Sequence, residues 1–340
     1  MTSDSVPSTQ QAIVQHRYGA ARDVLGTAGT PVRAPGPEEV QVQVRAAGVN
    51  PIDWQMIEGN RRLISRRRFP FTPLFDLAGV VTAVGEGVTG FRVGDRVHAD
   101  NEIDGGGGAE YVTVRTGLLA PVPDGLDFAA AAALPLAGQT ALTCLDRGGV
   151  TAGSRVAVIG ASGGVGHLAV QMAHAAGAYV VGVASGRNGD FVRSLGADEI
   201  MDRTETVLSS AYGADAFDVV IDCVGGRDQW VQARQVLRPG GRFVTIARDE
   251  DGEVTVASAA RLVTTITARR LRGAGTRGTK YVPVFLKSSA PLLHRVNTLT
   301  TEGHVRAHIS RTFPLTLEGV NTAIEESRAG RVIGKLVLQR

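Results

Sequence analysis

Cysteine is scarce in this sequence, and its scarcity excludes two kinds of stabilising centre. Only two of the 340 residues are cysteines, Cys144 and Cys223, and they stand far apart in apolar surroundings. A disulfide framework needs several paired cysteines, and a zinc site needs thiolate or imidazole ligands in a closed set. We therefore expect neither a disulfide framework nor a metal site.

Long apolar runs are also absent. No stretch of the sequence approaches the roughly 20 residues that cross a bilayer as a helix. Residues 1–10 are polar, and they lack both the basic start and the apolar centre of a signal peptide. The sequence therefore predicts a disordered leader over residues 1–10 and a cytoplasmic protein.

An excess of charge of one sign is missing as well. The chain carries 36 basic and 33 acidic residues, and its net charge of +3 gives no general reason to expect nucleic-acid binding. The one local concentration is residues 61–68, where five of the eight positions are arginine. Such a run is usually a solvated loop, but steering of an anionic substrate and binding of RNA remain open.

Glycine is abundant, with 43 residues, and one glycine-rich stretch is the most informative part of the chain. An apolar run over residues 155–159 predicts a strand, and a glycine turn, a helical pattern and a second apolar run at 179–183 follow it. This order is typical of the unit that binds a dinucleotide pyrophosphate at a helix N-terminus, although Ala161 replaces the first glycine of the usual motif. The alternative is an ordinary strand–helix turn. The predicted cofactor contacts in this loop are Ser162, Gly163, Gly164 and Val165.

The residues after the second apolar run favour a phosphorylated cofactor. A site that prefers NAD carries an acidic residue about 20 residues past the glycine motif. The sequence has Ser185, Arg187 and Asn188 there, and no carboxylate. Because a guanidinium can hold a 2′-phosphate through two charge-assisted hydrogen bonds, we predict NADPH, with Arg203 as a second candidate for the phosphate. The alternative is that Arg187 is a solvated loop residue.

The pattern of apolar segments and turns changes twice along the sequence. Residues 11–126 contain short apolar or alternating segments between turns, and they predict a mainly β domain with a flexible glycine link at 105–108. Residues 127–269 alternate strands and helices, which predicts a doubly wound parallel sheet. Residues 270–340 no longer show this regular alternation and again have a mixed pattern. The expected fold class is therefore α/β with a second, mainly β domain.

Several short motifs along the chain carry a resemblance to a known family. They are Gly48–Asp53, Gly79–Val81, Val93–Val97, Ala132–Pro135, Gly160–Gly166, Leu195–Asp198 and Gly334–Lys335. Together they resemble the medium-chain dehydrogenase/reductase superfamily, and specifically its zinc-free quinone oxidoreductase branch. The resemblance implies a GroES-like catalytic domain made from residues 11–126 and 270–340 around a central Rossmann domain at 127–269. It also implies an active site in the cleft between them, and a homodimer.

The chain departs from the alcohol dehydrogenases of this superfamily at their zinc ligands. Those enzymes have a catalytic cysteine near the position of Asn50, a Gly-His-Glu motif near the position of Phe75–Leu77, and a loop of four cysteines. None of these ligands is present here. Without a Lewis acid, a simple alcohol is hard to oxidise, and an activated hydride acceptor such as a quinone or an α,β-unsaturated carbonyl is easier.

The resemblance also implies roles for single residues. Asn50 is placed beside the nicotinamide and substrate, where its amide can donate to a carbonyl oxygen, or it is only a turn residue before Pro51. Asp53 positions a water or, as the better prediction, caps a helix. Lys335 is placed near the cofactor, or it is a surface lysine. The remaining predicted cofactor contacts are Thr140 (otherwise a helix cap), Cys223, Val224, Ile246 and Gly275.

These inferences predict an NADPH-dependent, zinc-independent reductase of quinones or α,β-unsaturated carbonyls, with a role in natural-product biosynthesis as one version. No histidine has the neighbours of a proton donor, so water is expected to deliver the proton. One alternative is a cofactor-binding protein without redox turnover. Lens-crystallin relatives in this branch bind NADPH and also nucleic acid, and the arginine run at 61–68 is the feature here that hints at it. Another is non-redox chemistry on a biosynthetic intermediate.

Overall fold

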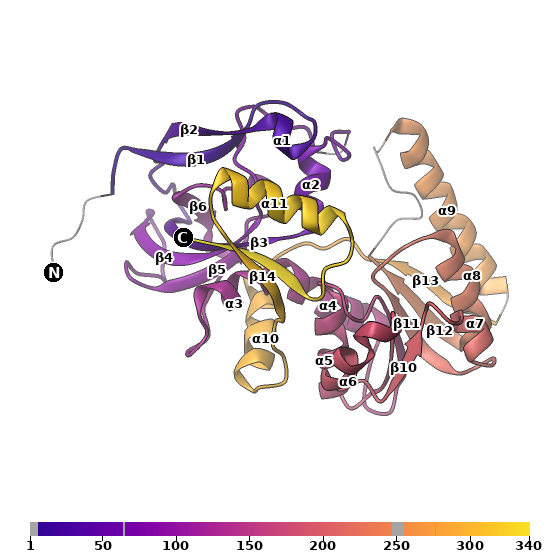
Figure 1. Ribbon diagram of the computed structural model, residues 1–340. Helices are drawn as coiled ribbons and strands as arrows, with labels where there is room; N and C mark the ends of the chain where they lie inside the picture. The colour runs from indigo at the N-terminus through magenta and orange to yellow at the C-terminus, as the bar shows by residue number, and fades with distance from the viewer. Residues whose placement is uncertain (1–5, 64, 247–254, 276) are drawn as a thin grey trace. The chain divides into compact units, whose positions relative to one another are not determined.

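Two large sheets organise the described part of the chain, and each belongs to a separate compact unit. The computed structural model describes residues 6–63, 65–246, 255–275 and 277–340 (Figure 1). The first unit comprises Met1–Gln139, Ser288–Thr301 and Ala307–Arg340. The second comprises Thr140–Lys287 and Glu302–Arg306. These bounds differ from the expected ones, since the prediction assigned residues 127–139 to the cofactor domain and residues 270–287 to the catalytic domain.

The first unit is built on a seven-stranded, mainly antiparallel sheet. Its strands run in the order β14-β15-β3-β4-β5-β7, and β6 also pairs with β3. A separate two-stranded hairpin, β1 and β2, completes its β structure. The strands are β1 (Thr9–Gln15), β2 (Leu25–Pro31), β3 (Glu39–Val49), β4 (Asp76–Val84), β5 (Arg96–Asp100), β6 (Tyr111–Arg115), β7 (Leu119–Pro121), β14 (Ile309–Pro314) and β15 (Lys335–Gln339).

Short helices connect and cover these strands. Asp127 caps α3, because its Oδ1 accepts a hydrogen bond from the Ala130 N–H at 2.7 Å. The helical segments are α1 (Ala21–Val24), α2 (Pro51–Ile57), η1 (Glu102–Asp104), η2 (Thr116–Leu118), α3 (Phe128–Ala132), α10 (Ala290–Thr301) and α11 (Leu317–Arg328). A further helix, α4 (Pro135–Gly148), begins in the first unit and continues in the second.

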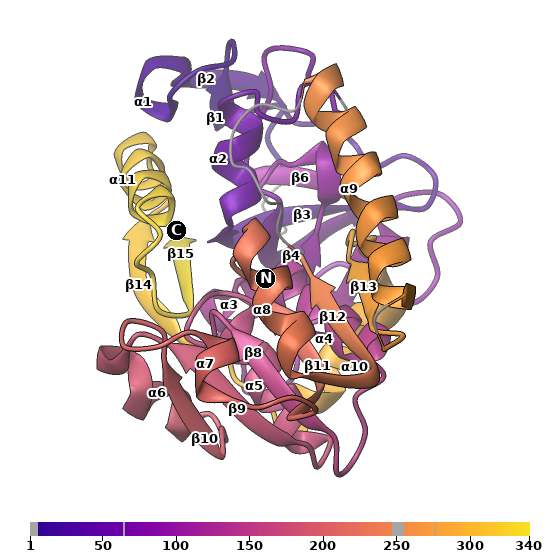
Figure 2. The same cartoon turned by 90° about the vertical axis from the view of Figure 1, so that its right-hand side faces the viewer.

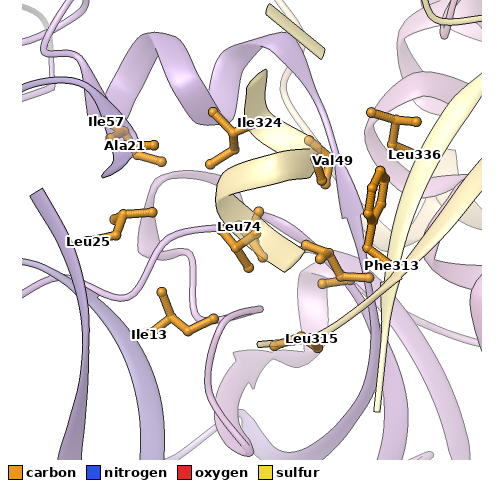
Figure 3. Packing of buried hydrophobic residues seen from close by; sticks show 14 of the residues in the cluster. Ile13, Ala21, Leu25, Val49, Ile57, Leu74, Phe313, Leu315, Ile324 and Leu336 are labelled. Atoms are coloured by element: carbon orange, nitrogen blue, oxygen red, sulfur yellow. The ribbon is translucent and has the colours of Figure 1, made fainter. Parts of the chain in front are cut away.

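One apolar cluster joins the two ends of the chain in the first unit (Figure 3). Ile13 and Leu25 come from the N-terminal hairpin, whereas Phe313, Ile324 and Leu336 come from the last 30 residues, and all are buried. Their packing explains why the C-terminal strands β14 and β15 extend the sheet started by β3. A mainly β, GroES-like unit that includes the C-terminal strands is thereby confirmed.

The second unit is a six-stranded parallel sheet in the order β10-β9-β8-β11-β12-β13. The order reverses between β8 and β11, as in doubly wound dinucleotide-binding domains. Its central strands β8 and β9 are almost wholly apolar rather than alternating, as expected for strands that are buried on both faces. The strands are β8 (Arg155–Ile159), β9 (Tyr179–Ala184), β10 (Glu199–Asp202), β11 (Phe217–Asp222), β12 (Leu237–Thr245) and β13 (Lys280–Pro283).

Along the sequence, helices of the second unit connect successive strands, and they pack on the sheet (Figure 2). Helix α5 contacts β8 and β9, and α8 contacts β11 and β12. The helical segments are α5 (Gly166–Ala175), η3 (Gly186–Asn188), α6 (Gly189–Ser194), α7 (Leu208–Ala211), α8 (Arg227–Val236) and α9 (Val256–Gly275). The Rossmann architecture that the glycine motif predicted is confirmed.

Three local predictions differ from the structure. Strand β1 begins at Thr9, so residues 9 and 10 belong to a hairpin and not to a disordered leader. The chain is still in the parallel sheet at β13, which pairs with β12, so it does not return to the first unit at residue 270. The glycine link at 105–108 is buried, and its backbone donates hydrogen bonds to the carbonyl groups of Thr72, Pro73 and Leu74.

Candidate active site

The glycine loop of the second unit connects β8 to α5 by a close backbone approach. Gly160 has a φ of +79°, which favours glycine. A Cβ on Gly166 would lie only 2.0 Å from the Gly160 carbonyl oxygen, so a side chain there would push the helix away from the strand. Both glycines are therefore required for α5 to begin directly above the end of β8.

The residues between these two glycines form the face that we expect a pyrophosphate to meet. Ser162, Gly163, Gly164 and Val165 are each half-buried, and they precede the first turn of α5. A Cβ on Gly163 would have only the Gly160 carbonyl oxygen nearby, at 3.3 Å. The first amides of a helix have no acceptor within it and carry its positive dipole end. The loop therefore offers the helix N-terminus that a dinucleotide pyrophosphate needs, and cofactor contact by these four residues stays a prediction.

A hydrogen bond ties this loop to the end of the neighbouring strand. Asn188 is buried, and its Nδ2 donates to the Ser162 Oγ at 3.0 Å. Ser185 is half-buried beside it, whereas Arg187 and Arg203 are exposed. The predicted contacts from β8, β9 and β10 thus meet at the carboxyl edge of the sheet, because parallel strands end on the same side.

This edge also carries a carboxylate that the sequence motifs did not indicate, Asp202. Asp202 ends β10, and its Oδ1 accepts hydrogen bonds from the Thr204 N–H at 2.8 Å and the Thr204 hydroxyl at 2.7 Å. These bonds, with a backbone bond from Gly186, hold the pKa of Asp202 below its usual value. The dinucleotide-binding motif places its acidic residue directly after β9, whereas Asp202 is the last residue of the next strand.

The ends of β11 and β12 bring the next group of predicted residues to the same edge. Val224 lies over the glycine loop, because a Cβ on Gly160 would meet its Cγ2 at 2.8 Å. Asp222 is buried and orders this turn, since its Oδ1 accepts from the Val224 N–H at 3.0 Å. Desolvation raises the pKa of the Cys223 thiol well above its usual value. Ile246 directly follows β12 and is half-buried.

Two further predicted contacts lie on helices of the second unit. Thr140 is buried within α4, so the alternative that it caps a helix is excluded. Gly275 is the last residue of α9. Cofactor contact by either residue stays a prediction.

The first unit contains a buried polar cluster around Asn50. The Asn50 Nδ2 donates to the Asp76 Oδ2 at 2.8 Å, and the Asn50 Oδ1 accepts a short hydrogen bond from the Lys335 Nζ. Lys335 is also 3.5 Å from Asp76 Oδ2 and donates to the Val49 carbonyl group at 3.3 Å. Lys335 is 2% exposed, so it is not a surface lysine. The cluster fixes which way the Asn50 amide points.

Asp53 orders the backbone around this cluster. Its Oδ2 accepts from the Asn50 N–H at 2.7 Å at the start of α2, and its Oδ1 accepts from the Phe75 N–H at 3.2 Å. The predicted capping role of Asp53 is thus consistent with its contacts, which belong to a capping box. Burial raises the pKa of Asp53 to about 8.

Two acidic residues that the sequence analysis did not select complete the cluster. Asp76 Oδ1 accepts from the Leu136 N–H at 2.8 Å, and burial raises the pKa of Asp76 although Lys335 opposes the shift. Asp100 ends β5 and accepts a short hydrogen bond from the Ser288 hydroxyl. Burial also raises the pKa of Asp100 to about 7. The sequence feature that could have indicated both residues is an aspartate at the first or last position of an apolar strand.

The arginine run at 61–68 is not a uniform solvated surface. Arg67 is 9% exposed, and its guanidinium lies 4.1 Å from the centre of the Phe71 ring. Arg61 donates to the Gln55 Oε1 at 2.9 Å. Only part of the run is therefore available to an anionic partner.

The part of the chain that the structure describes offers no cluster of metal ligands and no membrane-spanning helix. No group of three or more His, Cys, Asp or Glu side chains in that part of the chain is arranged to hold a metal ion. No described helix is long and apolar enough to span a bilayer. Asn50 and Phe75–Leu77 stand where a zinc-dependent relative has ligands, and they supply a single carboxylate. The residues present do not fit a zinc centre.

Comparison with known proteins agrees with this architecture. Residues 36–124 match the alcohol dehydrogenase GroES-like domain, and residues 195–338 match the zinc-binding dehydrogenase family. The chain is 33% identical to the chloroplast envelope quinone oxidoreductase homolog of Arabidopsis thaliana over 96% of its own length and 98% of that protein. The chain belongs to the medium-chain dehydrogenase/reductase superfamily.

Two further relatives narrow the family assignment. The NADPH-dependent alkenal/one oxidoreductase of Arabidopsis thaliana is 31% identical, with 99% of this chain and 82% of that protein covered. The structure of the quinone oxidoreductase from Coxiella burnetii is 29% identical, with a TM-score of 0.83 over 98% of this chain and 99% of that chain. Within the superfamily the chain belongs with the quinone oxidoreductases, and the family implies NAD(P)H as the cofactor.

Proposed function

We propose that this protein is an NADPH-dependent, zinc-independent reductase of quinones or α,β-unsaturated carbonyls. The observation that carries the proposal is the half-buried loop Ser162–Val165, which lies where the strand order of the parallel sheet reverses. Ligands of doubly wound sheets bind outside the strand ends at this point. The names of the relatives, which include quinone oxidoreductases and an alkenal/one oxidoreductase, support the reaction class.

The chain's own residues have separate tasks in this proposal. The loop Ser162–Val165 and the first turn of α5 bind the pyrophosphate, and Arg187 with Arg203 attracts the 2′-phosphate. Bound NADPH supplies the hydride. The Asn50 amide donates one N–H to Asp76, and its second N–H is the donor that we propose for the substrate carbonyl oxygen. Lys335 and Asp76 keep that amide in one orientation. Water delivers the proton.

The acceptor must be activated, because the residues named above provide hydrogen bonds and no Lewis acid. A conjugated carbonyl spreads the incoming negative charge onto an oxygen, where one amide donor stabilises it. Hydride addition to a saturated ketone instead leaves the charge localised on one alkoxide oxygen, which needs stronger stabilisation than a single amide donor gives. The proposal therefore includes quinones and enones and excludes saturated ketones.

Cofactor consumption with three acceptors tests the proposal. The purified full chain is mixed with NADPH and a quinone, an alkenal or a saturated ketone, and the NADPH absorbance is followed. We expect oxidation with the quinone or the alkenal and none above background with the ketone. Oxidation with none of the three, or with the ketone alone, would contradict the proposed reaction.

We also propose a homodimer, which the family resemblance implies. The second unit has an open sheet edge at β13, and several apolar side chains near it are exposed. Open strand edges and exposed apolar groups favour association. The exposed residues are Val263 (64%), Leu271 (69%) and Phe285 (70%). Light scattering tests this proposal, and a monomer at micromolar concentration would contradict it.

A further inference from the structure

The carboxyl edge of the second unit carries both signs of charge. Asp202 and Ala184 are paired in the parallel ladder of β10 and β9, so these strands end at the same level. A Cβ on Gly186 would lie 2.1 Å from the Asp202 Oδ2, which places the carboxylate directly against the start of η3. Arg187 is the next residue of η3 and is exposed. A negative and a positive side chain therefore flank the same short turn.

Hydrogen bonds hold this turn and its carboxylate in place. Thr204 donates to the Asp202 Oδ1 with both its N–H and its hydroxyl, and the Arg203 N–H donates to the Ala184 carbonyl group at 2.9 Å. On the other side, Asn188 donates to Ser162 in the glycine loop. The carboxylate is thus fixed by the residues after β10, while the turn itself is fixed to the predicted pyrophosphate loop.

The end of β9 is where a doubly wound sheet receives the adenosine ribose of a dinucleotide. A carboxylate at that place accepts a hydrogen bond from a free 2′-hydroxyl and repels a 2′-phosphate, whereas a guanidinium attracts the phosphate. Asp202 reaches this place from the third strand of the unit rather than from the second. Repulsion of a 2′-phosphate by Asp202 and its attraction by Arg187 therefore act at the same turn.

We infer that Asp202 is a specificity residue that limits the preference for NADPH over NADH, so that the chain binds both dinucleotides. The inference rests on the proposed function, since it concerns the same cofactor site. Arg187 attracts a 2′-phosphate and Asp202 opposes it. Asp202 is half-buried and solvent screens part of its charge, so the effect is modest in size.

Four nucleotides and three forms of the full chain test the inference by calorimetry. The nucleotides are NADPH, NADH, 2′,5′-ADP and 5′-AMP, and the last two isolate the 2′-phosphate from the rest of the cofactor. The forms are the natural chain, Asp202→Asn and the control Asp198→Asn. Asp198 is a matched control, because its Oδ2 accepts from the Val180 N–H at 2.7 Å at the opposite end of the same pair of strands.

We expect Asp202→Asn to bind NADPH and 2′,5′-ADP about fivefold to tenfold more tightly, with NADH and 5′-AMP changed by less than about twofold. Asp198→Asn should bind all four as the natural chain does. The gain should shrink at high salt, since salt screens exposed charges. Asp202→Ser, which also removes the charge, replaces Asp202→Asn if the amide disturbs the turn.

The outcomes separate the inference from the proposed function. If the natural chain binds the nucleotides and the ratio of NADPH to NADH affinity is unchanged in Asp202→Asn, only the role of Asp202 is wrong. An equal gain for 2′,5′-ADP and 5′-AMP, or the same gain in Asp198→Asn, would also overturn it. If the natural chain binds none of the four, the proposed cofactor site itself is wrong.

Discussion

Asp76 and Asp100 lie directly opposite each other on the neighbouring strands β4 and β5, and both are buried. Like charges in this position repel each other, and Asp76 contributes to the raised pKa of Asp100. Lys335 reaches Asp76 from the last strand of the chain and partly compensates this repulsion. This buried cluster therefore depends on the Lys335 cation and on protons held by its acidic residues.

Replacement of Lys335 by methionine should destabilise the first unit by about 3–5 kcal/mol, because it leaves a buried carboxylate without its partner. Chemical denaturation measures the change. Lys287→Met, at an exposed lysine, is the control and should stay within about 0.5 kcal/mol. The double variant Lys335→Met with Asp76→Asn should recover part of the loss, because the Asn50 amide can turn and accept from the new amide. No recovery would contradict an electrostatic role for the pair.

Protons on Asp100 should make the stability depend on pH. Its pKa is about 7 in the folded chain and near 4 when unfolded, so the folded chain binds more protons between these values. Stability should therefore be greatest at low pH in this window and fall as the pH rises from about 4 to 7. The Asp76 and Glu102 carboxylates nearby act in the same direction.

The variant Asp100→Asn isolates this contribution. Its amide can still accept from the Glu102 N–H and donate to the Ser288 hydroxyl, and it cannot ionise. We expect it to be more stable than the natural chain at pH 8 by roughly 1–3 kcal/mol, with a smaller difference at pH 5. Unfolding by denaturant at both pH values measures this, with the exposed Asp228→Asn as control. A larger gain at pH 5 than at pH 8 would be the wrong sign.

Gly163→Asp should weaken NADPH binding by about tenfold or more, because it places a carboxylate where we expect the pyrophosphate. The site tolerates a Cβ, since only the Gly160 carbonyl oxygen lies within 4 Å, at 3.3 Å. Gly213→Asp adds the same charge in open space on the same unit and should leave binding unchanged. Fluorescence titration compares the two, and equal affinities would argue against this loop as the phosphate site.

Gly106→Ala should destabilise the chain by about 2–4 kcal/mol, because the new Cβ meets a side chain in a strained backbone conformation. Gly106 has a φ of +101°, and its Cβ would lie 2.3 Å from the Val112 Cγ2. The control Gly117→Ala has no atom within 4 Å. A thermal unfolding midpoint unchanged in Gly106→Ala would support the flexible link that the sequence suggested.

The parts of the fold with strong local signals could be predicted from the sequence. The glycine motif and the apolar runs at 155–159 and 179–183 correctly predicted the start of a parallel sheet, because their spacing alone defines the unit. Strand β13 has only four residues and follows a long helix, so the boundary after residue 287 had no such signal. The same holds for Gly105–Gly108, whose burial depends on a distant segment around Thr72.

The site was predictable only where its residues follow one motif. Ser162 to Val165 are consecutive, and a single glycine motif in the sequence includes all four. Asp202 was missed because it reaches the turn after β9 from the end of a different strand. The cluster of Asn50, Asp76 and Lys335 combines segments that meet only through the pairing of β15, β3 and β4. Such contacts are tertiary, and no spacing along the chain encodes them.

Titration of NADPH into the purified chain tests the central claim most directly. The claim is that the loop Ser162–Val165 of the second unit binds the dinucleotide that supplies the hydride. We expect saturable calorimetric binding of one NADPH per chain, lost or strongly weakened in Gly163→Asp and kept in Gly213→Asp. Absence of binding by the natural chain, or equal binding by both variants, would contradict the account.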